Sequence, residues 1–344
     1  MNETPDGYEV PDPDGYEVPD VVEHLHSRAQ LSPLRVTRLS GGVSAETLLV
    51  EARPARLVVK RALERLQVAG DWTAKPERAL TEAAAMELLH RLTPDHTPEL
   101  RDVDARTNTI VMTAAPADWV PWKSVLFGDL PDPTPGFAAS AASLGEILGT
   151  WHSRTWHEED VAGRFADYEA FDQLRVRPFH RAVAAVHPAV AGRIDDLAEE
   201  LLSRRDCLVH GDFSPKNVLV GPLGIMVLDF EVAHVGAAVF DVAFLQSHLV
   251  LKALHVPQRA AQIAEAAATF LKTYERTCPE GGTATTERLS RHIACLLLAR
   301  VDGLSPAAYL SPATAVAVRR LALDFLRQRD PSVTELWDRV KGAA

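Results

Sequence analysis

Two short stretches near the middle of the chain decide how the sequence is interpreted: HGDFSPKNVLV at residues 210–220 and MVLDFEVAH at residues 226–234. The first contains Asp212 and Asn217 in the order H-x-D-x-x-x-x-N, and the second places Asp229 directly after an apolar run. Transfer of a nucleotide's γ-phosphoryl group needs metal ions on the phosphates and a carboxylate that positions the acceptor hydroxyl. Magnesium prefers oxygen ligands. We therefore expect Asn217 and Asp229 to hold magnesium and Asp212 to orient the acceptor and accept its proton.

The length and composition are those of a globular protein of about two domains. The chain has 344 residues, of which 47% are hydrophobic and 24% charged, with a formal net charge of −11. This charge argues against a nucleic-acid partner and is compatible with a cationic small-molecule acceptor. No run approaches the roughly 18 apolar residues of a membrane span, and the N-terminus lacks the apolar segment of a secretory signal.

The cysteines are three in number and show no CxxC spacing. We expect Cys207, Cys278 and Cys295 to be reduced, buried thiols. Together with the absence of a signal or a membrane span, this predicts a cytoplasmic protein with no membrane partner. The sequence leaves both a monomer and a homodimer open.

The chain changes character along its length. Residues 1–20 hold two copies of PDGYEVPD, rich in Pro and acidic residues, and are predicted to be a flexible tail. Residues 21–116 contain short alternating runs typical of strands and one helix, KPERALTEAAAMELLHRL at 75–92. Residues 117–344 are mainly helical in pattern. We therefore expect a β-rich N-lobe followed by a larger helical C-lobe.

The motifs at 210–217 and 227–233 resemble those of the aminoglycoside phosphotransferase and choline kinase group, small-molecule relatives of the protein kinases. The resemblance covers roughly residues 35–310. In the front half, LSGGVSAET at 39–47 is similar to the group's phosphate-covering loop, and VVK at 58–60 to its strand lysine. TEAAAMELL at 81–89 is similar to the helix that bears the lysine's glutamate partner, and TIVMTAAP at 109–116 to the adenine-binding hinge. The resemblance implies a bilobal, α+β protein kinase-like fold.

The resemblance also implies roles for single residues. Lys60 would contact the α- and β-phosphates of ATP or GTP, held by an ion pair with Glu82. Main-chain groups around Met112 and Ala115 would bind the base, and His210 would be a structural member of its loop. The phosphate-covering loop would offer main-chain or hydroxyl donors from Gly41, Gly42 and Ser44.

Three residues depart from the protein kinase pattern. Gly211 stands in place of the arginine of HRD, Ser214 in place of the catalytic-loop lysine, and Glu231 in place of the glycine of DFG. These departures point away from a protein kinase switched by phosphorylation. Ala45 also stands where the group often has Asn, so one phosphate contact of that loop is missing.

The function expected from these features is Mg2+-dependent transfer of the γ-phosphate of ATP or GTP to a hydroxyl of a small molecule. The acceptor would be an antibiotic of the aminoglycoside, macrolide or nucleoside type, with a role in resistance. Three alternatives remain: a kinase for a small metabolite of the choline, homoserine or sugar type, a non-catalytic nucleotide-binding scaffold, and a protein kinase. The acidic run at 157–172 would either line a pocket for a polyamine-like acceptor or face solvent, and RVDGLSP at 300–306 could face the acceptor.

Some features favour purely structural interpretations. His152 and His157 are expected on a solvated helix face rather than at a metal site, because no zinc-ligand spacing is completed. Gly145 and Gly149 are expected to allow close helix packing. Asp241 is expected to brace the loop that follows Asp229.

Overall fold

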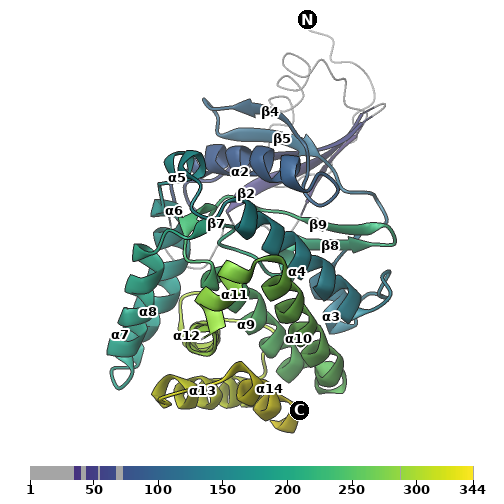
Figure 1. Ribbon diagram of the computed structural model, residues 1–344. Coiled ribbons are helices and arrows are strands. Elements are labelled where there is room, and N and C mark those ends of the chain that lie inside the picture. The colour runs from purple at the N-terminus through teal and green to yellow at the C-terminus, as the bar shows by residue number, and fades with distance from the viewer. Residues whose placement is uncertain (1–34, 40–43, 53–54, 67–72, 287, 344) are drawn as a thin grey trace, which may run out of the picture. The chain divides into compact units, whose positions relative to one another are not determined.

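The computed structural model describes residues 35–39, 44–52, 55–66, 73–286 and 288–343. The tail predicted at residues 1–20 lies outside these ranges, and so do Gly41 and Gly42 of the predicted phosphate-covering loop. The chain divides into two compact units, one formed by Met1–Leu88 and Pro98–Ala115, the other by Leu89–Thr97 and Pro116–Ala344. The first is β-rich and the second mainly helical (Figure 1), in agreement with the predicted α+β class.

The first unit is built on one antiparallel sheet of five described strands, in the order β1-β2-β3-β5-β4. The strands and the helix of this part of the chain are β1 (Arg35–Arg38), β2 (Ala45–Glu51), β3 (Arg56–Ala62), α2 (Arg78–Leu92), β4 (Leu100–Asp104) and β5 (Thr109–Thr113).

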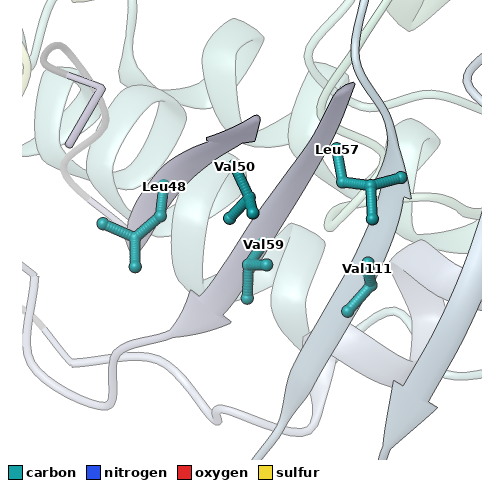
Figure 2. Close-up of a cluster of buried hydrophobic side chains, with 5 residues drawn as sticks. All are labelled: Leu48, Val50, Leu57, Val59 and Val111. Carbon is teal, nitrogen blue, oxygen red and sulfur yellow. The ribbon is translucent and has the colours of Figure 1, made fainter. Parts of the chain in front are cut away.

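The core of this sheet comes from alternate residues of three neighbouring strands (Figure 2). Leu48 and Val50 of β2 lie opposite Val59 and Leu57 of β3, and Val59 in turn lies opposite Val111 of β5. Side chains two residues apart on a strand point to the same face, so the alternating pattern in the sequence becomes one continuous apolar layer. All five side chains are at most 3% exposed.

Helix α2 confirms the helix predicted at residues 75–92, with a start three residues later. Its buried residues Ala79, Ala83 and Met86 recur at helical spacing, which gives one apolar face. Glu82, also buried, lies among them.

The second unit contains two small sheets, β10-β7 and β6-β8-β9, and a large set of helices. Its strands are β6 (Val120–Pro121), β7 (Cys207–Val209), β8 (Val218–Gly221), β9 (Gly224–Val227) and β10 (His234–Gly236). Its helices before β7 are α3 (Trp122–Phe127), α4 (Phe137–Arg154), α5 (Glu159–Arg164), α6 (Glu169–Phe171), the π-helical η1 (Asp172–Arg181), α7 (Ala182–Val186) and α8 (Ala191–Ser203). Those after β7 are η2 (Pro215–Asn217), α9 (Val239–His255), η3 (Pro257–Arg259), α10 (Ala260–Thr277), α11 (Pro279–Thr286), α12 (Leu289–Asp302), α13 (Pro312–Arg327) and α14 (Val333–Ala343).

Helices α4 and α10 lie side by side in very close contact (Figure 1). A Cβ atom added at Gly145 would lie 2.6 Å from the main-chain oxygen of Phe270, and one at Gly149 would lie 2.7 Å from the side chain of Thr277. Both distances are too short for a real contact, so only glycine allows this approach. The expected role of the two glycines in helix packing is confirmed.

Helix α9 forms the centre of the second unit. All of its residues from Val239 to Ala253 are buried, as expected for a helix surrounded by protein. Cys207, Cys278 and Cys295 are free and buried, as predicted. Among the described residues, no single helix has the length and apolar character to cross a membrane; α9 and α10 meet that test only together, as a pair bent by 120°.

Candidate active site

The loop that carries Asp212 begins where β7 ends and makes a sharp turn at Gly211. This glycine has φ +77°, a left-handed conformation that side chains disfavour. A Cβ atom here would also lie 2.7 Å from the main-chain oxygen of Val232. Both constraints exclude a larger residue, which explains in physical terms why glycine occupies the position of the kinase arginine.

Asp241, in the first turn of α9, holds this turn in place. Its carboxylate accepts hydrogen bonds from the main-chain nitrogens of His210, at 2.6 Å, and Gly211, at 2.9 Å. Burial alone would raise the pKa of Asp241, but the hydrogen bond and charge of His152 and the contacts with His210 outweigh it, and the pKa is lowered. Asp241 was expected to brace the loop that follows Asp229. It does brace a loop, but the one that carries Asp212, because its carboxylate at the start of α9 accepts hydrogen bonds from the main chain just after β7.

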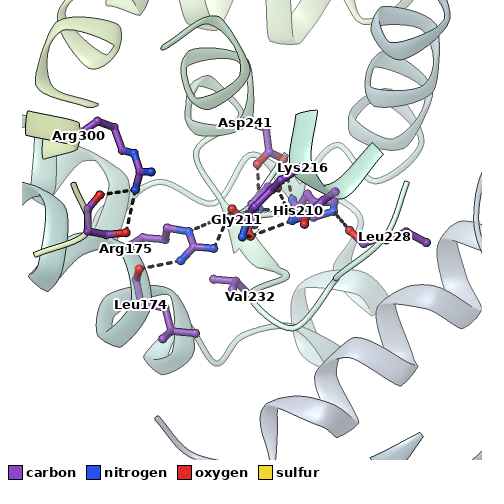
Figure 3. Close-up of polar contacts among 12 residues, drawn as sticks. Leu174, Arg175, His210, Gly211, Lys216, Leu228, Val232, Asp241 and Arg300 are labelled. Atoms are coloured by element: carbon purple, nitrogen blue, oxygen red, sulfur yellow. Dashed lines mark hydrogen bonds and ion pairs between the residues drawn. The ribbon is translucent and has the colours of Figure 1, made fainter. Parts of the chain in front are cut away.

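His210 links the same loop to the strand that precedes Asp229. Its Nδ1 accepts a hydrogen bond from the main-chain nitrogen of Asp212, at 3.1 Å, so Nε2 carries the proton that is donated to the oxygen of Leu228, also at 3.1 Å (Figure 3). Burial lowers the pKa of His210. A neutral ring with both nitrogens bonded to the main chain fits a structural role, as the sequence suggested.

Asp212 is buried and surrounded by donors. Its Oδ1 lies 3.0 Å from an Arg175 nitrogen, and its Oδ2 lies 2.7 Å from Lys216 Nζ and 2.8 Å from the amide nitrogen of Asn217. Burial would raise its pKa, and the charge of Asp229 acts in the same direction, but Arg175 and Lys216 prevail and the pKa is lowered. The side chain is therefore a carboxylate at neutral pH, an acceptor for hydroxyl protons.

Asn217 and Asp229 flank the β8–β9 hairpin at its open end, Asn217 before β8 and Asp229 after β9. The main-chain nitrogen of Leu228 donates to the oxygen of Asn217 at 2.9 Å, which places these two metal-ligand candidates on neighbouring chain segments. Asp229 has φ +73°, a conformation that is uncommon outside glycine and often occurs at functional sites. Its charge opposes the lowering of the pKa of both Asp212 and His210, so the two carboxylates lie close enough to repel each other.

These side chains fit a magnesium ion. Asp212 and Asp229 offer carboxylate oxygens, and Asn217, whose amide nitrogen donates to Asp212, has its amide oxygen as the remaining polar group. Magnesium is held by such hard oxygen ligands together with phosphates and waters, and a cation would relieve the repulsion between the two carboxylates.

Two cationic residues of this site were missed by the sequence analysis. Lys216 lies inside the HGDFSPKN motif and could have been found there, four residues after Asp212. Arg175 gave no signal, because it lies 37 residues earlier in η1. Its guanidinium is fixed by hydrogen bonds to the oxygens of Gly211 and Leu174, both at 2.7 Å (Figure 3).

In the first unit, the structure joins Lys60 and Glu82 as predicted. Lys60 Nζ lies 2.8 Å and 3.0 Å from the two carboxylate oxygens of Glu82, and both residues are buried. The ion pair links β3 to α2. Because the charge of each side chain is compensated by the other, the lysine is held in one position at the surface of the sheet.

The other described residues predicted for nucleotide binding, Ser44, Met112 and Ala115, lie in or next to the inner strands β2 and β5 of the same sheet. The main-chain oxygen of Ser44 accepts hydrogen bonds from Leu63 and from the guanidinium of Arg78. Met112 is buried within β5, which pairs with a strand on either side. The main-chain oxygen of Ala115 accepts a hydrogen bond from Arg56 at 3.0 Å. Their part in base and phosphate binding stays a prediction.

His152 corrects a sequence-based expectation. It is completely buried rather than solvated, and its ring contacts Tyr274 Oη at 2.9 Å and Asp241 at 3.4 Å. The expectation failed because this face of α4 is covered by α10. His157 is exposed, as expected. Neither histidine belongs to a group of metal-ligating side chains in the part of the chain that the structure describes.

The acidic run at 157–172 mainly faces solvent. Four of its carboxylates are exposed: Glu158, Glu159, Asp160 and Asp167. The structure therefore favours the solvent-facing alternative over a pocket for a polyamine-like acceptor.

The β-rich first unit, the helical second unit and the Asp212 loop define a protein of the kinase-like phosphotransferase class. Comparison with protein families is more specific: the chain belongs to the phosphotransferase enzyme family APH, whose model matches residues 35–280.

Relatives of known name are similar over part of their length. Methylthioribose kinase 2 of Oryza sativa subsp. japonica is 26% identical over 257 residues, which are 64% of this chain and 60% of the relative. Methylthioribose kinase of Pectobacterium atrosepticum is 28% identical over 233 residues, 60% of this chain and 57% of the relative. The chain thus spans about 60% of the length of the curated relatives it matches.

A solved structure supports the fold. An amicoumacin kinase in complex with AMP-PNP, Ca2+ and Ami superposes with a TM-score of 0.56 at 16% identity, over 92% of this chain and 95% of that chain. At such low identity the likeness shows the fold alone.

Proposed function

We propose that this protein transfers the γ-phosphoryl group of ATP or GTP to a hydroxyl group of a small molecule, with magnesium. The observation that carries the proposal is the buried Asp212 carboxylate, paired with Arg175 and Lys216 and close to Asp229. This is the combination that phosphoryl transfer needs: a carboxylate to position the hydroxyl, metal ligands, and cations for the charge on the transferred group. The family membership and the methylthioribose kinase relatives support it.

In the proposed reaction, the acceptor oxygen forms a bond to the γ-phosphorus while the bond to the bridging oxygen breaks. Asp212 accepts the hydroxyl proton and holds the hydroxyl in line. Arg175 and Lys216, both in contact with Asp212, stabilise the charge on the transferred group. Asn217 and Asp229 would hold magnesium, which supplies charge neutralisation on the phosphates. Lys60, fixed by Glu82, would contact the α- and β-phosphates.

For the acceptor we favour a sugar-like hydroxyl compound. The relatives that are similar in sequence are methylthioribose kinases. An antibiotic acceptor with a role in resistance stays a prediction of the sequence, as do a cytoplasmic location and the division into lobes at residues 21–116 and 117–344.

The test is nucleotide turnover by the Asp212→Ala variant. Positioned general bases contribute typically about 100- to 10,000-fold, so kcat should fall by that factor with every acceptor that the wild type phosphorylates. Nucleotide affinity, measured by the thermal shift with AMP-PNP, should be retained. Asp160→Ala, which removes an exposed carboxylate, is the control. Normal turnover by Asp212→Ala would refute the role of Asp212, and labelled phosphate on generic protein substrates would favour a protein kinase.

A further inference from the structure

Cationic side chains from distant parts of the chain gather around Asp212. Arg175, Lys216, Lys252 and Arg300, here called the cation cluster, come from η1, the Asp212 loop, α9 and α12. Contacts through Phe244 and His248 join the members that touch Asp212 to Lys252: the Arg175 guanidinium lies 5.6 Å from the ring of Phe244, the Phe244 ring lies 4.9 Å from the ring of His248, and Lys252 Nζ lies 3.5 Å from the oxygen of His248. The pKa of His248 is lowered well below its ordinary value by burial, then by the charges of Lys252, Arg300, Lys216 and Arg175, in that order. A protein with a net charge of −11 thus concentrates positive charge at this one place.

The inner part of the cation cluster, Lys252 and Arg300, makes no ion pair among the described residues. Lys252 is 1% exposed, and its Nζ makes one long hydrogen bond, 3.5 Å, to the oxygen of His248. It otherwise faces the rings of Phe127, at 5.5 Å, and Tyr309, at 5.9 Å. Arg300 donates to the main-chain and side-chain oxygens of Ser305. In the described ranges no carboxylate forms an ion pair with Lys252 or Arg300.

Two hydrogen-bond donors near Lys252 and Arg300 also lack acceptors. Arg300 Nε and Tyr309 Oη are buried and, among the described residues, have no hydrogen-bond partner. Buried cations without a paired anion are costly, and unmatched donors add to that cost. A ligand that presents several acceptor oxygens and a negative charge would satisfy all of these groups at once.

We propose that the cation cluster binds an anionic group, a carboxylate or a phosphate, of the acceptor whose hydroxyl is positioned by Asp212. The proposal rests on the proposed function and specifies its substrate class. It replaces the cationic acceptor that net charge suggested, because the local charge beside Asp212 is positive although the overall charge is negative. Arg175 and Lys216 also face the transferred phosphoryl group, so Lys252 and Arg300 are the residues that discriminate between acceptors. The half-exposed Lys216 marks the side of the cluster that is open to solvent.

The experiment compares anionic acceptors with neutral and cationic ones. The full chain is assayed with Mg2+ and ATP or GTP, at constant ionic strength, on matched sets of glycerate, glycerol phosphate and glycerol, and of gluconate, ribose 5-phosphate and ribose. Kanamycin and choline are the cationic members. Charge-assisted hydrogen bonds correspond to about 10- to 100-fold in affinity, so kcat/KM should be higher by that factor for the carboxylates or the phosphates. If the higher kcat/KM is found for the carboxylates, the cluster binds a carboxylate; if it is found for the phosphates, the cluster binds a phosphate.

Variants assign the preference to the cluster. Arg300→Gln and Lys252→Met should raise KM for the anionic acceptor about 10- to 100-fold and reduce the preference over the neutral partner, while the thermal shift caused by AMP-PNP and Mg2+ stays. Arg276→Gln, which changes an exposed arginine of α10, should keep the preference. Equal kcat/KM for neutral or cationic acceptors would overturn the inference and leave the proposed function intact.

The two proposals can fail separately. If no acceptor is phosphorylated, the proposed function fails, and the inference is then read from the thermal shift with each acceptor alone. A larger shift with the anionic members for the wild type than for Arg300→Gln supports an anion site. Equal shifts for charged and neutral members refute it.

Discussion

At the scale of single residues, the site contains buried charges, and the groups around them compensate some of these charges much better than others. Asp212 has two cationic partners and Asp241 accepts from two main-chain nitrogens, so both remain ionised although burial opposes it. Lys252 has no such compensation, and its pKa falls to about 7. The same burial therefore gives an anionic acceptor of protons in one place and a weakly held cation in another.

Lys252 should make stability depend on pH just above neutrality. Burial first, then the charges of Lys123 and Arg300, lower its pKa from 10.5 to about 7. Between these values the unfolded chain binds more protons than the folded one, so the free energy of unfolding rises with pH. From pH 7 to 8 we expect an increase of about 1 kcal/mol from this residue.

The measurement is urea unfolding at pH 7 and pH 8, below the range in which the raised thiol and phenol pKa values act. Lys252→Met should remove this contribution to the increase and be the more stable protein at pH 7. Lys272→Met, which changes an exposed lysine of α10, should behave as the wild type. Identical pH dependence in Lys252→Met and wild type would show that Lys252 is not strained by burial.

At the scale of elements, glycines decide how closely the helices of the second unit approach. Gly145 and Gly149 place α4 against the main chain of α10, and this contact covers the face of α4 that carries His152. The buried His152 then reaches Asp241 in α9. Helix packing and the position of the Asp212 loop are thus linked through one buried histidine.

Gly145→Ala should destabilise the protein by about 1–3 kcal/mol, the usual cost of overpacking. The added Cβ would lie 2.6 Å from the main-chain oxygen of Phe270, so the helices must separate. Gly192→Ala in α8, where a Cβ meets no atom within 4 Å, should be neutral or stabilising by up to about 1 kcal/mol. Free energies of unfolding in urea compare the two; equal values would contradict the packing argument.

At the scale of the whole molecule, the chain carries a net charge of −11, yet the described part of the second unit gathers cations around one carboxylate. Such an arrangement stores unfavourable electrostatic energy in the unliganded protein, a cost often found at functional sites. Ligand binding should recover part of it, so stability is expected to respond strongly to ligands.

AMP-PNP with Mg2+ should raise the free energy of unfolding by about 2.7 kcal/mol at a concentration 100-fold above its Kd. EDTA should remove most of this gain, since the phosphates then lack the cation that Asn217 and Asp229 would hold. Asp229→Ala should lose the Mg2+-dependent part, and Asp160→Ala should keep it. A nucleotide shift that is unaffected by both EDTA and Asp229→Ala would contradict the proposed metal ligands. Thermal denaturation with and without each ligand is the measurement.

Much of the fold and part of the site could be predicted from the sequence. The helix at 75–92, the α+β class, the buried cysteines and the Lys60–Glu82 pair all follow from local patterns or motif order, and the structure bears them out. The target of Asp241 and the burial of His152 could not be predicted, because each depends on which helix covers which face.

The sequence by itself determined the spacing of Asp212, Asn217 and Asp229, because these residues lie in the segments just before and just after one hairpin, β8–β9, whose geometry is local. Only the tertiary structure decided the charge of their surroundings. Arg175 and Arg300 come from helices tens of residues away on either side, and no local pattern specifies where such helices pack. The electrostatic field around a carboxylate depends on all charges nearby in space, whatever their separation along the chain.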